Sequence, residues 1–278
     1  MQGHRYIFVG GLHRSGTSLL ARLIAGIPGV AAIRGAPVPE DEGVYLQGAI
    51  PHTALHGAPM HFATDPAQHL VEGCLHDRLE VRHRLEADWA PHFGPGRWRV
   101  EKSPVNLTRM RLYQQLFPLS QFVVVMRHPE AVAAATSKWV AQSPAAMMRH
   151  WLEAHEQLAR DLPYLHCVMV LRYEDIVAAP GQALARLAAF LGEPPAPLRS
   201  EIRDGNAAYR GCARLAPDMA ARALDWGYRP GLGTEPRPPL VRHMLRSIRE
   251  AALAPPGAGP GPRDAGLPPF PRPRQEAP

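Results

Sequence analysis

A glycine-containing loop between an apolar run and a helical pattern is the feature that most constrains the fold of this chain. Residues 11–18 read GLHRSGTS, which matches the spacing of a phosphate-binding loop, G-x-x-x-x-G-K-[ST], except that Thr17 stands at the lysine position. An apolar run covers residues 5–10, and leucines and isoleucines recur at helical spacing over residues 19–27. The sequence therefore predicts a strand, an anion-binding loop and a helix, in that order.

Further apolar runs predict more strands, each followed by a helix. Residues 121–126 and 166–171 are typical of strands buried on both faces, and a weaker strand in WRVEKSP ends at Lys102. Helices are expected from Pro129 through the alanine-rich stretch that follows, and over residues 181–191. This alternation predicts a P-loop-like α/β fold of three layers, in which a central parallel β-sheet is flanked by helices.

One domain is expected, over residues 1–253. Residues 254–278 are dominated by proline and glycine, and they contain too few apolar groups to offset the entropy lost on ordering the chain. We expect them to form a disordered tail. Residues 35–97 are rich in histidine and proline and have no clear period, so we expect loops and short helices that form a substrate wall.

Composition narrows the possible partners. The net charge of +6 fits an anionic ligand, and no basic run with interleaved aromatic residues indicates nucleic acid. No stretch approaches the roughly 20 apolar residues of a membrane span, and the N-terminus lacks the long apolar region of a signal peptide, so we expect a cytoplasmic protein with no membrane partner. The three cysteines are far apart, and no metal site is predicted.

The unusual polar residues follow the predicted strands. In open parallel sheets, ligands bind beyond the carboxyl ends of the strands, and Arg14, Lys102, Arg127 and residues 172–175 all belong there. An enzyme of nucleoside triphosphates needs an acidic Mg²⁺ ligand after a buried strand, whereas the run FVVVM is followed by Arg127. This pattern favours a phosphate-bearing donor that transfers a less charged group.

Four motifs in this order resemble those of a known enzyme family. GGLHRSGTSLL, EKSP, VVVMRHPEAVAAATSKW and VLRYEDI together look like a sulfotransferase that uses 3′-phosphoadenosine 5′-phosphosulfate (PAPS). The sequence is closest in style to the tyrosylprotein and heparan sulfate branches and their bacterial relatives. The resemblance implies PAPS as the sulfonate donor, no metal, and a hydroxyl acceptor that is a sugar, a tyrosine or a small alcohol or phenol.

The resemblance also implies which residues bind the donor. The 5′-phosphosulfate loop would consist of Arg14, Ser15, Gly16, Thr17 and Ser18. Arg127 would begin the segment that binds the 3′-phosphate, and Tyr173 would line the nucleotide pocket. Ala135 stands where the family usually has a serine, so Thr136 or Ser137 must substitute for it, or the contact is lost.

Two further residues are predicted to act on the transferring group. Lys102 matches a lysine that contacts the bridging oxygen of the sulfonate, and Arg14 would help it to stabilise charge on the leaving phosphate. The acceptor hydroxyl needs a base, and Glu42 is favoured because EGVYLQ resembles the glutamate-x-x-aromatic element of related enzymes. Glu40 is the second choice.

Several alternatives stay open. Asp41 belongs to the same acidic row, and His52 is a minor competitor because some sulfotransferases use a histidine base. A P-loop phosphotransferase that uses ATP is disfavoured by Thr17 and by the lack of an acidic metal ligand. Ala135 leaves room for a nucleotide-binding protein without turnover.

Overall fold

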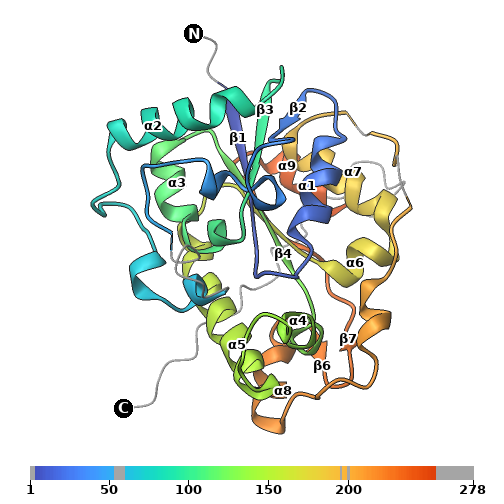
Figure 1. Ribbon diagram of the computed structural model, residues 1–278. Coiled ribbons are helices and arrows are strands. Elements are labelled where there is room, and N and C mark those ends of the chain that lie inside the picture. Colours follow the sequence, from blue (N-terminus) through green and yellow to red (C-terminus); the bar gives the residue numbers. More distant parts are fainter. Residues whose placement is uncertain (1–3, 53–59, 195, 199–200, 255–278) are drawn as a thin grey trace.

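A six-stranded sheet forms the centre of the computed structural model, which describes residues 4–52, 60–194, 196–198 and 201–254 (Figure 1). In spatial order its strands are β2 (Val30–Ala32), β3 (Trp98–Lys102), β1 (Arg5–Gly10), β4 (Gln121–Met126), β5 (Val168–Arg172) and β8 (Leu240–Arg242). Neighbouring strands are parallel except β8, which is antiparallel to β5. The predicted α/β fold is confirmed, with an antiparallel edge strand added.

Helices cover both faces of the sheet because its strands are apolar on both sides. Every residue of β4 is buried. In β1, Tyr6 and Phe8 belong to one buried cluster, whereas Ile7 and Val9 belong to the other. Successive side chains of a strand point to opposite faces, so a continuous apolar run builds two cores at once.

The helices divide between these two cores (Figure 1). The face that contains Ile7 carries α1 (Thr17–Ala25), α6 (Tyr173–Ala178), α7 (Pro180–Leu191) and α9 (Arg246–Leu253). The opposite core contains residues of α2 (Leu79–Trp89), α3 (Met110–Leu116), α4 (Pro129–Thr136), α5 (Pro144–Asp161) and α8 (Pro217–Leu224). A small ribbon pairs β6 (Tyr228–Arg229) with β7 (Gly233–Thr234).

One segment differs from the sequence expectation. Residues 35–97 contain short 3-10 turns as expected, but also the eleven-residue α2. Only Leu85 and Trp89 of α2 are buried, so its apolar period is too sparse to recognise. The helix expected from Pro129 through the alanine-rich stretch is present as α4. A further helix, α5, begins after Ser143, whose hydroxyl accepts a hydrogen bond from a backbone N–H of that helix. The predicted tail from residue 255 onward lies outside the described residues.

Candidate active site

The phosphate-loop sequence folds into the turn between β1 and α1. Gly16 has a φ of 103°, and a Cβ at this position would lie 2.9 Å from the Tyr173 ring, so both conformation and space require glycine. Thr17 is buried at the start of α1. The buried Ser15 Oγ has no hydrogen-bond partner within the described ranges. A helix N-terminus with a free hydroxyl beside it fits an anion.

A buried ion pair lies at the end of β3. Lys102 Nζ is 3.1 Å from Oε1 of Glu42 and 2.8 Å from the carbonyl oxygen of Glu40. Burial raises the pKa of Glu42 to about 7, although the Lys102 ammonium opposes this rise. Glu42 therefore changes protonation near neutral pH, which suits a general base.

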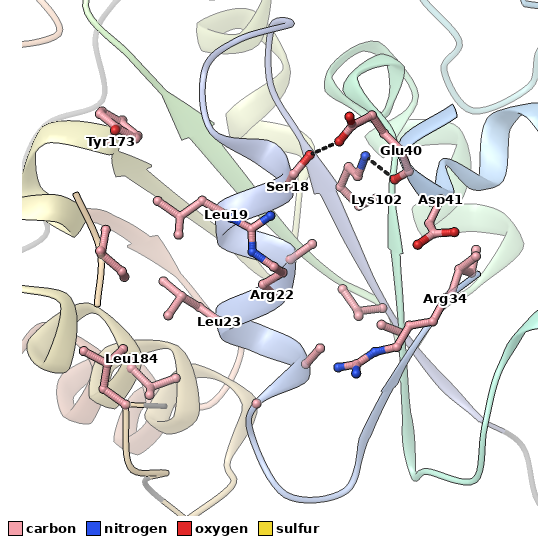
Figure 2. A pocket seen from close by; sticks show the side chains of 18 of the residues that line it. Ser18, Leu19, Arg22, Leu23, Arg34, Glu40, Asp41, Lys102, Tyr173 and Leu184 are labelled. Carbon is pink, nitrogen blue, oxygen red and sulfur yellow. Dashed lines mark hydrogen bonds between the residues drawn. The ribbon is translucent and has the colours of Figure 1, made fainter. Parts of the chain in front are cut away.

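The three neighbouring acidic residues have different surroundings. Glu40 is exposed, and its Oε2 accepts a hydrogen bond of 3.1 Å from the Ser18 hydroxyl (Figure 2). Asp41 Oδ1 accepts one of 2.8 Å from the backbone N–H of Ala36. Of these three, Glu42 alone is buried within an ion pair. The arrangement favours Glu42 as the base.

The guanidinium of Arg127 connects the end of β4 to the phosphate loop. Its Nη1 donates to the Arg14 carbonyl oxygen at 2.9 Å, and its Nε donates to Oδ1 of Asn206 at 2.8 Å. Its Cζ lies 4.4 Å from the ring centre of Tyr173 and 5.3 Å from that of Tyr209. Nη2 is buried without a hydrogen-bond partner among the residues the structure describes. An unpaired cationic donor between two aromatic rings fits a phosphate.

Sequence reasoning missed Asn206 and Tyr209. Both belong to a 3-10 turn, Gly205–Tyr209, whose first backbone N–H donates to the Tyr173 hydroxyl at 2.8 Å. The turn lies in a stretch without apolar periodicity, far along the chain from Arg127. No local signal identifies it, because its contact with the arginine is made only by folding.

The two residues expected to replace the missing serine direct their hydroxyls into their own helix. Thr136 Oγ1 donates to the carbonyl oxygens of Val132 and Ala133 at 2.8 and 3.2 Å, and Ser137 Oγ donates to that of Ala134 at 2.8 Å. Intrahelical bonds of this kind are common for hydroxyl side chains. Their predicted role in donor binding therefore gains no support from the geometry.

Arg14 contacts the other site residues through its backbone carbonyl oxygen. The residue has a φ of 65°, and its carbonyl oxygen accepts the bond from Arg127. Its exposed guanidinium lies over the Trp139 ring, with Cζ 5.3 Å from the ring centre. The contact between the Arg14 side chain and the donor stays a prediction.

Two histidines, His13 and His52, are uncharged at neutral pH because their pKa values are lowered. Burial lowers the pKa of His52 to about 4, and burial together with Lys102 lowers that of His13 to about 4. His52 also packs against Tyr45, with ring centres 5.5 Å apart. A group with so low a pKa is a weak base, so this observation favours Glu42 over His52.

A cavity of about 910 Å³ lies over α1, which is sufficient for a nucleotide. Ser18 and Lys102 line its polar side, and Tyr173 lies across α1 among apolar side chains (Figure 2). Lys102 contacts Glu42, and Tyr173 contacts Arg127. The cavity is therefore bordered by both groups of predicted site residues.

A family model described as the sulfotransferase family matches residues 6–197. The chain belongs to the sulfotransferase family. This confirms the resemblance seen in the four motifs, and it makes the protein a member of an enzyme family that uses PAPS. A search of curated proteins finds no significant match.

Solved structures of other sulfotransferases resemble this one at low identity. The sulfotransferase domain of the curacin biosynthetic pathway is 21% identical, with 71% of this chain and 77% of that chain covered and a TM-score of 0.43. The sulfotransferase domain of the Synechococcus PCC 7002 olefin synthase is 16% identical, with 90% of this chain and 93% of that chain covered and a TM-score of 0.45. The sulfotransferase from Alicyclobacillus acidocaldarius is 17% identical, with 80% of this chain and 96% of that chain covered and a TM-score of 0.46.

These matches do not identify the acceptor of this sulfotransferase. The family assignment rests on the family model, because the structural matches are distant. In the part of the chain that the structure describes, no helix has the length and apolar character needed to cross a bilayer.

Proposed function

We propose that this sulfotransferase moves a sulfonate group from PAPS to a hydroxyl acceptor. The observation that carries the proposal is the buried pair of Lys102 and Glu42 at the carboxyl end of β3. Lys102 lines the same cavity as Ser18 of the phosphate loop. A fixed cation and a base that titrates near neutrality supply what an in-line transfer to a hydroxyl requires.

Two polar groups that have no hydrogen-bond partner among the described residues support binding of the donor. The N-terminus of α1 with Ser15 suits a 5′-phosphate. The guanidinium of Arg127, between Tyr173 and Tyr209, suits a 3′-phosphate. PAPS has phosphate at both positions and supplies the sulfonate when it is bound.

Each residue of the ion pair has one task in the transfer. Glu42 accepts the proton of the acceptor hydroxyl, so that the acceptor oxygen forms its bond to sulfur while the bond from sulfur to the bridging phosphate oxygen breaks. Lys102 stabilises the negative charge that grows on that leaving oxygen. The contacts of Lys102 with Glu42 and with the Glu40 carbonyl oxygen hold the ammonium in place beforehand.

The test is transfer of radiolabelled sulfonate from PAPS into sugars, tyrosyl peptides, phenols and aliphatic alcohols. We expect label in at least one class of acceptor, and no transfer of labelled phosphate when ATP with Mg²⁺ replaces PAPS. Transfer from ATP would identify a phosphotransferase instead. Binding of PAPS without transfer to any acceptor would indicate a non-catalytic nucleotide-binding protein.

A further inference from the structure

A second buried carboxylate, Glu101, adjoins the ion pair along β3. Its side chain is 1% exposed, and within the described part of the chain it makes no ion pair. Lys102 and Val100 line the cavity, and Glu101 faces the other side of the sheet, because successive residues of a strand alternate. A buried carboxylate without a paired cation is costly to keep. Its presence at this position therefore points to a role that an apolar residue would not fill.

Three groups donate hydrogen bonds to Glu101. Oε1 accepts from the Gly43 N–H at 3.0 Å and from Ser103 Oγ at 2.5 Å, and Oε2 accepts from Asn106 Nδ2 at 2.5 Å. The pKa of Glu101 is raised, chiefly because burial disfavours the charged form, although these bonds and the Lys102 charge oppose the rise. The backbone N–H of Gly43 can only donate, so a carboxyl oxygen of Glu101 serves as its acceptor.

The same network holds the backbone that follows the base. Ser103 Oγ accepts a bond of 3.0 Å from the Val44 N–H, and Trp89 Nε1 donates to the Gly43 carbonyl oxygen at 2.9 Å. A Cβ on Gly43 would lie 2.7 Å from Cγ of Glu101, so glycine permits this close approach. Side chains from other elements thus bind both polar backbone groups of Gly43.

The turn before the base is strained and is held at both ends. Glu40 and Asp41 have φ angles of 53° and 54°, a conformation that residues other than glycine rarely adopt and that persists only where the surroundings hold it. Lys102 binds the Glu40 carbonyl oxygen on one side, and Glu101 binds the Gly43 N–H on the other. Loss of the second anchor would let the turn relax.

We infer that Glu101 is the positioning residue of the base, because it anchors Gly43 and so keeps the Glu42 carboxylate in contact with Lys102. The inference rests on the proposed function for the role of Glu42 as a base. The anchoring itself can be measured without any reaction.

Glu101 also influences the charge of the base. The charged and titratable groups that face this site are Lys102, Glu101, Glu40, Tyr45 and, beyond the lysine, His13. Lys102 favours the ionised form of Glu42, whereas the negative charges of Glu101 and Glu40 oppose it. Replacing Glu101 by a neutral residue removes one of these negative charges, but it also releases Glu42 from Lys102, whose effect on the pKa is the larger of the two. The pKa of Glu42 should therefore rise above about 7.

The main variant is Glu101→Gln, assayed in the full-length protein. We expect kcat to fall about 10- to 100-fold, because the base is displaced from its working position. The acidic limb of the pH profile of kcat/KM should move to higher pH, because the displaced Glu42 loses the ammonium that favours its ionised form. Affinity for adenosine 3′,5′-bisphosphate should stay within about threefold, because the donor groups lie elsewhere.

Two control variants separate anchoring from charge. Ser103→Ala frees the Val44 N–H but keeps the Glu101 charge, so kcat should fall and the acidic limb should move in the same direction as in Glu101→Gln, because anchoring is lost without any change of charge. Glu130→Gln removes another buried carboxylate that accepts backbone N–H bonds, from Leu215 and Leu232. The Glu130→Gln variant should leave the acidic limb of the kcat/KM profile unchanged. This result would show that the limb does not respond to the loss of every buried carboxylate that binds backbone N–H groups.

Two measurements need no acceptor. In Glu101→Gln, amide hydrogen exchange at Gly43 should become faster, and the pKa of Glu42 from carboxyl ¹³C titration should rise. If both stay at wild-type values, the inference is overturned. A wild type that transfers no sulfonate would refute the proposed function, and these two measurements would still decide the anchoring. If Glu101→Gln does not fold, the Ser103→Ala variant decides the question instead. If the Val44 amide of that variant exchanges hydrogen at the wild-type rate and its kcat is also that of the wild type, the inference is contradicted.

Discussion

At the residue scale, Glu42 differs from an ordinary carboxyl group because it is buried. A glutamate in water has a pKa of about 4.3, whereas burial raises that of Glu42 to about 7. Lys102, in direct contact, prevents a still larger rise. The pair therefore combines a base that can hold a proton near neutrality with a cation fixed beside it.

The pH dependence of turnover follows from this shift. Glu42 acts as a base only when ionised, so kcat/KM should fall about tenfold per pH unit below a midpoint near 7 and reach a plateau above it.

Glu42→Gln should lower kcat about 10²- to 10⁴-fold, with donor affinity nearly unchanged. Glu40→Gln is the control in the same kinetic assay. If Glu40→Gln is inactive and Glu42→Gln is active, the base is Glu40.

Lys102 should act mainly in the transition state. Lys102→Ala should lower kcat about 10²-fold or more, while adenosine 3′,5′-bisphosphate binds within a few fold. Lys102→Arg should restore little activity, because a planar guanidinium does not place charge as an ammonium does. Thr17→Lys should not rescue Lys102→Ala, since that lysine would reach a different oxygen. Wild-type turnover in Lys102→Ala, or activity that EDTA abolishes and Mg²⁺ restores, would contradict this role.

At the element scale, the site is assembled where strands end. β3 ends at Lys102, Arg127 follows β4, and β5 leads into Tyr173 at the start of α6. Strands β3 and β4 each pair in parallel with β1, and β5 pairs in parallel with β4. The carboxyl ends of all these strands therefore lie at the same edge of the sheet. The turn Gly205–Tyr209 then closes over the arginine.

Nucleotide preference tests this assembly. The wild type should bind adenosine 3′,5′-bisphosphate about 10- to 100-fold more tightly than 5′-AMP, because a charge-assisted contact contributes about 1.5 to 3 kcal/mol. Arg127→Ala should remove most of that preference, and Asn206→Ala should remove part of it by releasing the guanidinium. Ser137→Ala should leave it unchanged, because its hydroxyl donates to Ala134. Equal binding of both nucleotides by the wild type in calorimetry would refute the assignment.

At the scale of the whole molecule, two cores on opposite faces of one sheet hold the site elements in register. The last described helix, α9, contributes Ala252 to the core that also contains α1 and α7. The predicted domain boundary at residue 253 therefore coincides with the end of a packed helix.

Truncation tests the predicted domain boundary. Removal of residues 255–278 should change Tm by less than about 2 °C, because their composition offers few apolar groups for burial. A second truncation after Leu245 also removes α9 and should lower Tm by several degrees, because it exposes the core around Ala252. Thermal unfolding followed by circular dichroism measures both. A large loss of Tm in the first variant would show that the tail belongs to the domain.

The sequence by itself determined the fold class, the first strand–loop–helix unit and the family. These depend on contiguous signals: apolar runs such as residues 121–126, glycines at loop positions, and four ordered motifs. Such signals are local because backbone conformation and side-chain period are local properties. Lys102 and Arg127 could be selected for the same reason, since each follows or ends a predicted strand.

Only the tertiary structure decided which side chains meet. The contact of Asn206 and Tyr209 with Arg127, and that of Glu101 with Gly43, join residues far apart in the chain. The sequence offered three adjacent carboxylates without distinguishing their surroundings, and only folding buried Glu42 against Lys102. Burial and pKa depend on the density and charge of atoms brought together in space, and no local pattern encodes them.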